Sequence, residues 1–278
     1  MRPAEFDFVR AANVAEALGY LQYGSPIAGG QSLLRDMRQR QLSPRRLVDI
    51  SHIDELDYIN MDGDVLVVGA TTKLAAIAAS PLVKDKCDAL HQAAGFIGDV
   101  QIRNRGTAAG NICGTWSPAG WSVDIGVVLA ASKGEVVVRS VSGERRIDGA
   151  EFVAAEKSPI EVSELITELR FGAADKSAYV RLSRRTADAS IGSAAAFVTR
   201  KSGRLELGLA LGQVHRRIVR ATAVEAAVAS HGIDDLATDL ALAELARTVS
   251  PPDTAHANSE YRRSILPVIA KRAIRAAL

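Results

Sequence analysis

QIRNRGTAAGNICGTWSPAGWSVDIGVVL, residues 101–129, is the segment from which the architecture of the chain can be inferred. A turn of small residues, Gly106 to Asn111, opens it, and an apolar run that begins near Ser122 closes it. Small residues let a backbone approach a ligand closely and leave its N–H groups free to point outward. A second such turn lies upstream, at Ala28 to Ser32, and each turn stands beside a predicted helix. Together the turns predict a ligand with two phosphates held between them.

The composition is that of an ordinary globular protein, with 47% hydrophobic and 24% charged residues among 278. This length predicts about two domains. The net charge of +2 is too small to indicate binding to nucleic acid or to a membrane surface. No apolar run is long enough to span a bilayer, and the first residues lack the apolar core of a signal peptide. We therefore expect a cytoplasmic protein with no membrane span.

The chain has only two cysteines, Cys87 and Cys113, and five histidines. An iron–sulfur cluster normally needs four thiolates, so we do not expect this chain to carry one alone. The histidines show no metal-binding spacing, and no metal site is predicted. Cys87 is expected to be a small buried hydrophobe, whereas Cys113 lies in the central loop, where it could stand near a ligand.

Hydrophobic patterning predicts mixed helices and strands over the first 171 residues. Thr71 or Thr72 is expected to cap a helix that runs to Ala79. The other helices expected in this half cover residues 13–23, 33–40, 84–94 and 124–131. The expected strands cover residues 47–50, 135–139 and 165–171, and a hairpin turns at 61–64.

The pattern changes after a small, polar segment at residues 172–177, which is a plausible domain boundary. Three strands are expected next, at residues 179–182, 194–199 and 205–211. Three helices are expected to follow, at residues 219–230, 236–249 and 259–278. Antiparallel strands covered by helices make an α+β unit.

The two turns suggest a division of roles within the predicted site. A Cβ at Gly29, Gly30 or Gly110 would obstruct the approach of a phosphate. Side-chain donors at the same turns are Gln31, Ser32, Thr107 and Asn111. Asp124 accepts hydrogen bonds and suits a sugar-like hydroxyl better than a phosphate. The alternative, that both turns only connect strands to helices, is equally open at this point.

Two tryptophans, Trp116 and Trp121, lie in the loop that follows the second turn. They could be packing anchors, or they could stack on a ring or fill a subunit interface. The basic run from Arg35 to Arg46 and the pair Arg184–Arg185 are interpreted as solvated surface.

At these residues the sequence resembles the FAD-binding medium subunits of the molybdenum hydroxylases, the xanthine dehydrogenase and carbon monoxide dehydrogenase family. AGGQSLLRDM, from Ala28 to Met37, resembles the family's first motif, and IRNRGTAAGN, from Ile102 to Asn111, its second. The resemblance continues in family order through VGATTKLAAIA, SELITELRF, YVRLSRRTAD and the C-terminal SEYRRSILPVIAKRAIRAA. It thus covers nearly the whole chain.

The resemblance implies an α+β architecture. Residues 1–173 would form a two-lobed FAD-binding domain of the vanillyl-alcohol-oxidase type, with lobes at about 1–55 and 56–173. Residues 174–278 would form a domain with a three-stranded antiparallel sheet and a helical bundle.

The resemblance also implies the cofactor site. Both motifs would hold the FAD pyrophosphate, Asp124 would contact the flavin nucleotide, and Ile97 and Ile166 would make apolar contacts with FAD. Tyr179 and Arg181 lie where family members approach the isoalloxazine. The residues carried over from the two motifs are Ala28, Gly29, Gly30, Gln31, Ser32, Leu33, Ile102, Thr107, Ala108, Ala109, Gly110 and Asn111.

Three positions depart from the family pattern. Arg35 replaces the proline of the first motif, and Ala109 replaces the first glycine of the second doublet, where a methyl fits if φ is negative. Residues 114–122 look like an insertion, which suggests a loop specific to a partner or an electron acceptor. Because this insertion precedes Asp124, the match of Asp124 to the family's aspartate is less direct.

The function implied by the resemblance is electron transfer. A large partner would bind molybdopterin, a small partner would carry [2Fe-2S] clusters, and FAD on this chain would pass electrons to an external acceptor. The assembly implied is a dimer of heterotrimers, and no catalytic residue is expected on this chain. One alternative is a stand-alone flavin oxidase of related fold, for which Cys113 is the candidate for a covalent flavin link. Another is a nucleotide-binding module without redox turnover.

Overall fold

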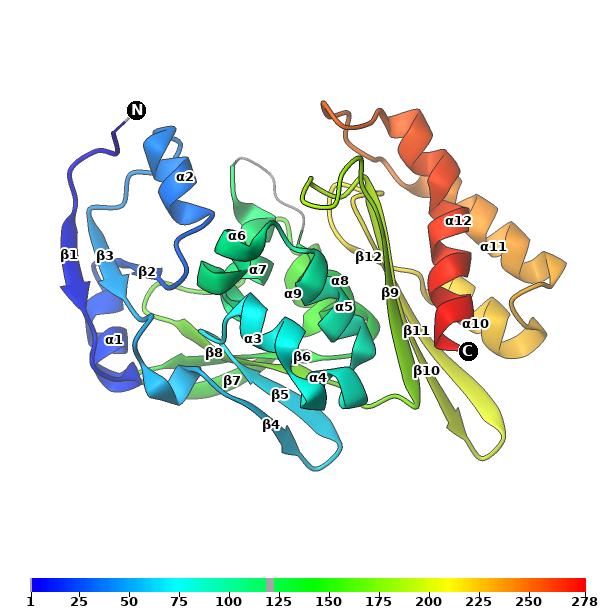
Figure 1. The fold of residues 1–278 in the computed structure, drawn as a ribbon, viewed down its shortest axis with the longest axis horizontal. Helices are drawn as coiled ribbons and strands as arrows, with labels where there is room; N and C mark the ends of the chain where they lie inside the picture. The colour runs from blue at the N-terminus through cyan, green and yellow to red at the C-terminus, as the bar shows by residue number, and fades with distance from the viewer. Residues whose placement is uncertain (1, 119–122) are drawn as a thin grey trace.

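The N-terminal lobe is a small parallel sheet with two helices. The computed structural model describes residues 2–118 and 123–278. Three strands pair in the order β1-β3-β2, with both pairings parallel. The elements of this lobe are β1 (Asp7–Arg10), α1 (Val14–Leu21), β2 (Ser25–Ile27), α2 (Leu33–Arg38), β3 (Arg46–Asp49) and the 3-10 turn η1 (Asp54–Leu56). The lobe forms one end of the molecule in Figure 1.

The second lobe is a five-stranded antiparallel sheet in the order β4-β5-β8-β6-β7. Its strands are β4 (Ile59–Asp62), β5 (Val65–Gly69), β6 (Glu135–Ser140), β7 (Gly143–Asp148) and β8 (Leu165–Phe171). Its helices are α3 (Leu74–Ala79), α4 (Pro81–Lys86), α5 (Asp88–Phe96), α6 (Val100–Arg105), α7 (Ala108–Cys113), α8 (Asp124–Ala131) and α9 (Gly149–Ala154), with the 3-10 turn η2 (Gly114–Trp116).

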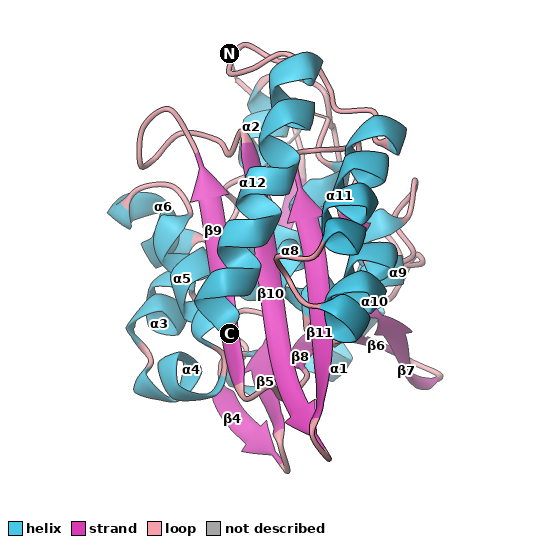
Figure 2. Ribbon diagram, turned by 90° about the vertical axis from the view of Figure 1, so that its right-hand side faces the viewer, coloured by secondary structure: helices cyan, strands magenta, loops and turns pink. Residues whose placement is uncertain are grey.

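The C-terminal part is a four-stranded antiparallel sheet in the order β12-β11-β10-β9, covered on its outer face by three helices (Figures 1 and 2). Its strands are β9 (Lys176–Leu182), β10 (Gly192–Lys201), β11 (Arg204–Gly212) and β12 (Val219–Arg220). Its helices are α10 (Thr222–His231), α11 (Leu236–Thr248) and α12 (Ser259–Ala277).

Helix α8 lies at the centre of the molecule, and all eight of its residues are buried. Apolar side chains on every face are typical of such a fully enclosed helix. The inner face of the C-terminal sheet packs against it, and the core of the second lobe therefore extends into that sheet through Ala195, Phe197 and Ala210. The edge strand β9 is covered by α5, where the amide of Tyr179 donates to Gln92 Oε1 at 2.8 Å.

Most predicted elements are present, and the α+β class is confirmed. The predicted helix at 84–94 is wrong: it is two helices, because Cys87 has φ −152° and breaks the helical path between α4 and α5. Neither threonine caps α3, whose N-cap is Lys73. Instead, Thr72 Oγ1 bonds both the amide and the carbonyl of Tyr58. The two-residue β12 adds a fourth strand to the predicted three-stranded sheet.

In the part of the chain that the structure describes, no helix is long and apolar enough to cross a membrane. Within the same residues, no group of three or more His, Cys, Asp or Glu side chains is placed to hold a metal ion.

Candidate functional site

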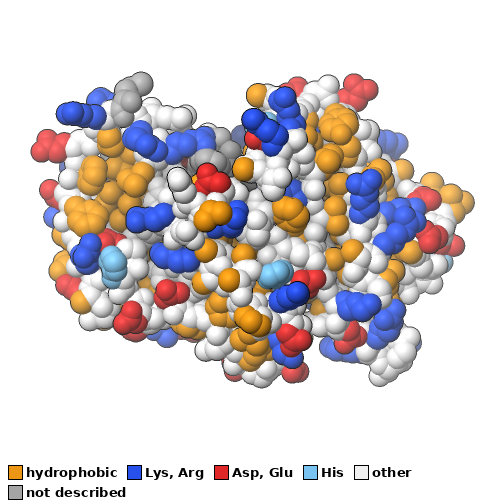
Figure 3. Space-filling model, viewed as in Figure 1, with side chains coloured by type: hydrophobic (Ala, Val, Ile, Leu, Met, Phe, Trp, Pro, Cys, Tyr) orange, Lys and Arg blue, Asp and Glu red, His pale blue; other side chains and the backbone are white. Residues whose placement is uncertain are grey.

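A cavity of about 730 Å³ lies between the two lobes and the C-terminal sheet. This volume is within the range of small-molecule and cofactor sites, roughly 300–1,000 Å³. Four segments supply most of its wall, at residues 24–36, 97–117, 158–166 and 181–189. Figure 3 shows the surface notched between the N-terminal lobe and the C-terminal part, with Lys and Arg side chains on both sides of the notch.

The first turn follows β2 and leads into α2. Gly30 has φ +71°, a left-handed conformation that favours glycine. The first amides of a helix have no partner within the helix. The backbone amides of the five residues from Gly29 to Leu33 donate to no acceptor among residues 2–118 and 123–278. This turn therefore brings a row of unpaired N–H donors to the cavity wall.

The second turn is the start of α7, and its amides are already used. Thr107 is the N-cap, and its Oγ1 accepts the amide of Gly110 at 3.2 Å. The amides of Ala108 and Ala109 donate to Thr72 O and Ala70 O at 2.9 and 3.1 Å. Ala109 is helical, so its methyl group is compatible with the local backbone. This turn therefore lines the cavity with its side chains and with the Cα of Gly110 rather than with free amides.

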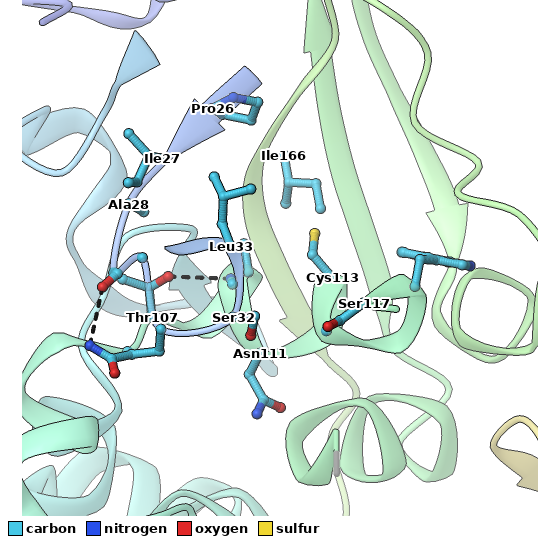
Figure 4. A pocket seen from close by; sticks show the side chains of 18 of the residues that line it. Pro26, Ile27, Ala28, Ser32, Leu33, Thr107, Asn111, Cys113, Ser117 and Ile166 are labelled. Atoms are coloured by element: carbon cyan, nitrogen blue, oxygen red, sulfur yellow. Dashed lines mark hydrogen bonds between the residues drawn. The ribbon is translucent and has the colours of Figure 1, made fainter. Parts of the chain in front are cut away.

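The two turns touch each other. A methyl group on Gly29 would lie 2.3 Å from Arg105 O and 2.9 Å from Gly106 Cα. Such distances are far below van der Waals contact, so the approach of the two loops requires glycine at position 29. Figure 4 shows side chains of both turns, including Ser32, Thr107 and Asn111, around one cavity.

A buried polar cluster stands behind one wall. The Tyr179 hydroxyl donates to Asp124 Oδ1, and Arg181 Nε lies 3.9 Å from the same oxygen. The side chains of Arg181 and Asp124 are only 3% and 2% exposed. Burial raises the pKa of Tyr179 well above its usual value, and the Asp124 carboxylate adds to this shift. Tyr179 is therefore a neutral hydrogen-bond donor at physiological pH.

All the residues predicted for the site line this cavity except two. Ala108 and Tyr179 lie just behind the wall and are buried. Asn111 also fixes α8, because its Oδ1 accepts the amide of Ile125 at 3.1 Å.

Sequence reasoning missed two parts of the wall. One is the segment at residues 158–164, and the other is Ala187 to Ala189 in the loop between β9 and β10. Neither contains a glycine motif. The sequence signal was that Ser163 and Glu164 open the family-like stretch SELITELRF and that Ala187 and Asp188 end YVRLSRRTAD. Reasoning also missed the bond from Ser117 Oγ to Asp36 Oδ2, 2.6 Å long, which links the loop after α7 to α2.

Cys113 and Trp116 both line the cavity, but Cys113 is the last residue of α7 rather than part of a loop, and Trp116 ends η2. The surface of Cys113 opens into the recess, but the protein around the thiol raises its pKa to about 12. A thiol with so high a pKa is a poor nucleophile near neutral pH. Trp116 is a packing anchor. Its ring packs edge-on against the ring of Phe152, with the ring centroids 5.0 Å apart, and its Nε1 donates to Ala155 O. Trp121 and the rest of residues 119–122 lie outside the described residues.

Comparison with known proteins agrees with this geometry. The family model for the FAD binding domain in molybdopterin dehydrogenase matches residues 4–172. The model for the CO dehydrogenase flavoprotein C-terminal domain matches residues 177–277. The chain belongs to the FAD-binding medium subunits of the molybdenum hydroxylases. It is thus an oxidoreductase subunit, and its cofactor is FAD.

Two members of this medium-subunit family match over nearly their whole length. The glyceraldehyde dehydrogenase medium chain of Sulfolobus acidocaldarius is 34% identical, with 99% of each chain covered. The carbon monoxide dehydrogenase medium chain of Hydrogenophaga pseudoflava is 30% identical, covering 100% of this chain and 98% of the relative. A solved structure of the carbon monoxide dehydrogenase from that organism superposes with a TM-score of 0.90 at 30% identity, covering 100% of this chain and 98% of the other.

The residues around the cavity suit FAD, which has an anionic pyrophosphate, sugar hydroxyls and two flat ring systems. The unpaired amides of the first turn match the pyrophosphate oxygens, since backbone N–H groups bind such anions without a lysine. Apolar side chains from three segments, including Ile97, Ile102 and Ile166, offer flat contact to a ring. A cavity with both kinds of surface is large enough to enclose much of such a ligand.

Proposed function

We propose that FAD binds in this cavity with its pyrophosphate at the turn Ala28–Leu33, and that the chain passes electrons from partner iron–sulfur clusters to an external acceptor. The observation that carries the proposal is the row of unpaired amides from Gly29 to Leu33 at the cavity wall. FAD supplies the ability to take up electrons singly and release them in pairs. The protein supplies the binding, the orientation and the exclusion of water.

Each group of residues has a proposed part in holding the cofactor. The amides of the first turn bind the pyrophosphate, with Gln31 and Ser32 as side-chain donors. Thr107 and Gly110 form the opposite side of the pyrophosphate site. The Asp124 carboxylate accepts a hydrogen bond from a sugar hydroxyl, and the apolar side chains of the wall contact the flavin ring. The chain contributes no acid or base, because the substrate chemistry takes place on another subunit.

The proposed assembly is a complex of three kinds of subunit. Relatives are named as medium chains or FAD subunits of dehydrogenases and a hydroxylase, which supports partners of other sizes. We propose a large molybdopterin-binding partner and a small partner with [2Fe-2S] clusters, assembled as a dimer of heterotrimers. We further propose a domain boundary near residues 173–174, supported by the gap between the two matched family models at 172–177.

The experiment compares two glycines that share a left-handed backbone. Gly30 has φ +71° and lies in the first turn, whereas Gly63 has φ +58° and lies in the β4–β5 hairpin, where no atom stands near an added methyl group. Alanine strains both backbones similarly. We expect Gly30→Ala to weaken FAD binding by about tenfold, which is about 1.4 kcal/mol, and Gly63→Ala to leave it unchanged.

The measurement is a fluorescence titration of flavin-stripped protein with FAD, made on the chain purified with its co-expressed partners. Equal FAD affinity in both variants would place the pyrophosphate elsewhere. A visible spectrum with a molybdenum and iron inventory of the purified material tests the assembly. Flavin together with two further subunits, molybdenum and iron supports it, and turnover of an organic substrate by the single chain contradicts it.

A further inference from the structure

Arg181 holds three separate segments of the cavity wall at once. Its Nη1 donates to the carbonyl of Phe96 at the end of α5, and its Nη2 donates to the carbonyl of Asp188 in the β9–β10 loop. Its Nε faces Asp124 Oδ1, at the start of α8, across 3.9 Å. Each of these three segments also lines the cavity: Asp188 and Asp124 do so themselves, and Ile97 does so next to Phe96.

The guanidinium is poorly placed to touch a ligand itself. Its side chain is 3% exposed, and both terminal nitrogens already donate to backbone carbonyls. Nε is buried as well, and Asp124 is the acid facing it. A rigid planar fork with several donors is the property in which arginine differs from lysine. The side chain forms part of the wall but is therefore suited to bracing it rather than to donating to a ligand.

The pairing with Asp124 also sets the charge of the wall. Asp124 is 2% exposed, and an isolated buried carboxylate is strongly disfavoured. The Arg181 guanidinium offsets that charge, and the Tyr179 hydroxyl adds a hydrogen bond to the same oxygen. With Arg181 present, the pair adds no net charge beside the cavity; without it, Asp124 loses its charged partner.

We propose that Arg181 is a positioning residue of the FAD site: it acts on the cofactor through Asp124 and the β9–β10 loop, fixing the shape of the wall and cancelling its charge. The inference rests on the proposed binding of FAD in this cavity. It assigns to the C-terminal domain, which supplies both Arg181 and that loop, a direct part in setting the flavin's affinity and potential.

The test uses Arg181→Gln and Arg181→Lys in the full chain with its co-expressed partners. Arg181→Gln is expected to weaken FAD binding at least tenfold and to shift the two-electron midpoint potential, because Asp124 beside the cavity loses its charged partner. Arg181→Lys keeps the positive charge but loses the planar guanidinium that donates to two carbonyls at once. It is expected to weaken FAD binding while leaving the potential close to that of the wild type.

Arg220→Gln is the matched control. Arg220 lies on β12, at the opposite edge of the same sheet, and makes a two-pronged pair with Glu225 that does not border the cavity. This variant is expected to lower the melting temperature without changing FAD affinity or potential. An equal loss of FAD affinity in Arg220→Gln and Arg181→Gln, at equal loss of stability, would show a merely structural role and overturn the proposal.

A double variant separates charge from shape. Asp124→Asn in the Arg181→Gln background removes the carboxylate that Arg181 faces, so the midpoint potential is expected to match that of Asp124→Asn alone if Arg181 acts through Asp124. Wild-type FAD affinity and potential in Arg181→Gln, or in Arg181→Lys if the glutamine variant does not fold, overturns the inference alone. Failure of the wild-type protein to bind FAD would overturn the proposed function itself.

Discussion

At the residue scale, the two glycine-containing motifs have different physical tasks. Gly30 provides a left-handed backbone, whereas Gly110 provides room for the helix cap at Thr107. A Cβ at position 110 would lie 2.7 Å from Thr107 Oγ1. Gly110→Val is therefore expected to displace the cap, lower stability by about 1 kcal/mol and reduce FAD content. Thermal unfolding and the flavin-to-protein absorbance ratio measure both effects.

Gly19 provides the control for this substitution. It lies inside α1, and no atom stands within 4 Å of a Cβ placed there. Gly19→Val should retain full flavin content. Full flavin content in Gly110→Val as well would show that the second turn does not border the cofactor.

These residues also show what sequence can predict. Gly29 and Gly30 are recognisable because a turn that needs a left-handed residue or a close backbone approach leaves a local mark in the sequence. Ala187 to Ala189 leave no such mark, because their place in the wall depends on how the C-terminal sheet docks on the second lobe. The role of Thr72 likewise depends on a tertiary contact, in this case one within the second lobe. Its hydroxyl could cap a helix locally, but it bonds instead to the backbone of Tyr58, just before β4.

At the scale of elements, the β6–β7 hairpin holds a part of the cavity wall that has no regular structure. Arg145, on β7, donates to both carboxylate oxygens of Glu164 and to the carbonyl of Pro159. These bonds tie the lining segment 158–164 to the sheet. The hydrogen bonds from Arg145 lower the pKa of Glu164 below its usual value.

A carboxyl group whose pKa is lowered on folding stabilises the fold above its unfolded pKa, and this stabilisation disappears as pH falls through the lower folded value. Glu164→Gln is expected to destabilise the protein by about 1 kcal/mol near neutral pH, a figure reduced because Arg145 is partly exposed to solvent. The difference from wild type should vanish under acidic conditions. Melting temperatures of both proteins across an acid-to-neutral pH series measure this.

Glu144→Gln is the comparison for the hairpin, since Glu144 pairs with Arg139 on the same two strands but is 39% exposed. It should change the melting temperature little at any pH. A constant difference between Glu164→Gln and wild type from acid to neutral pH would contradict the role given to the Glu164 carboxylate.

At the scale of the whole molecule, the C-terminal sheet and the second lobe share one core around α8. The contact is backbone against backbone at Gly208 of β11, where a methyl group would lie 2.1 Å from Ala131 O. Gly212, on the same strand, similarly leaves room for Val127 of α8. With so close a contact, we expect the wild-type chain to unfold in a single calorimetric transition although it contains two domains.

Gly208→Ala tests this coupling. The added methyl group cannot be accommodated without moving β11 away from α8, so we expect a loss of about 1–3 kcal/mol in stability, as is typical of overpacking. FAD affinity should fall as well, because the same sheet carries Arg181 and Ala187 to Ala189. Gly203→Ala is the comparison in the open β10–β11 turn: its φ of +76° strains an alanine backbone, but no atom lies near the added methyl group, so it destabilises the hairpin without a clash against α8. If Gly208→Ala lowers the melting temperature and leaves FAD affinity intact, the position of the C-terminal sheet does not govern the cofactor site. If both effects appear together in Gly208→Ala and neither appears to the same degree in Gly203→Ala, the docking of this sheet on α8 shapes the FAD cavity.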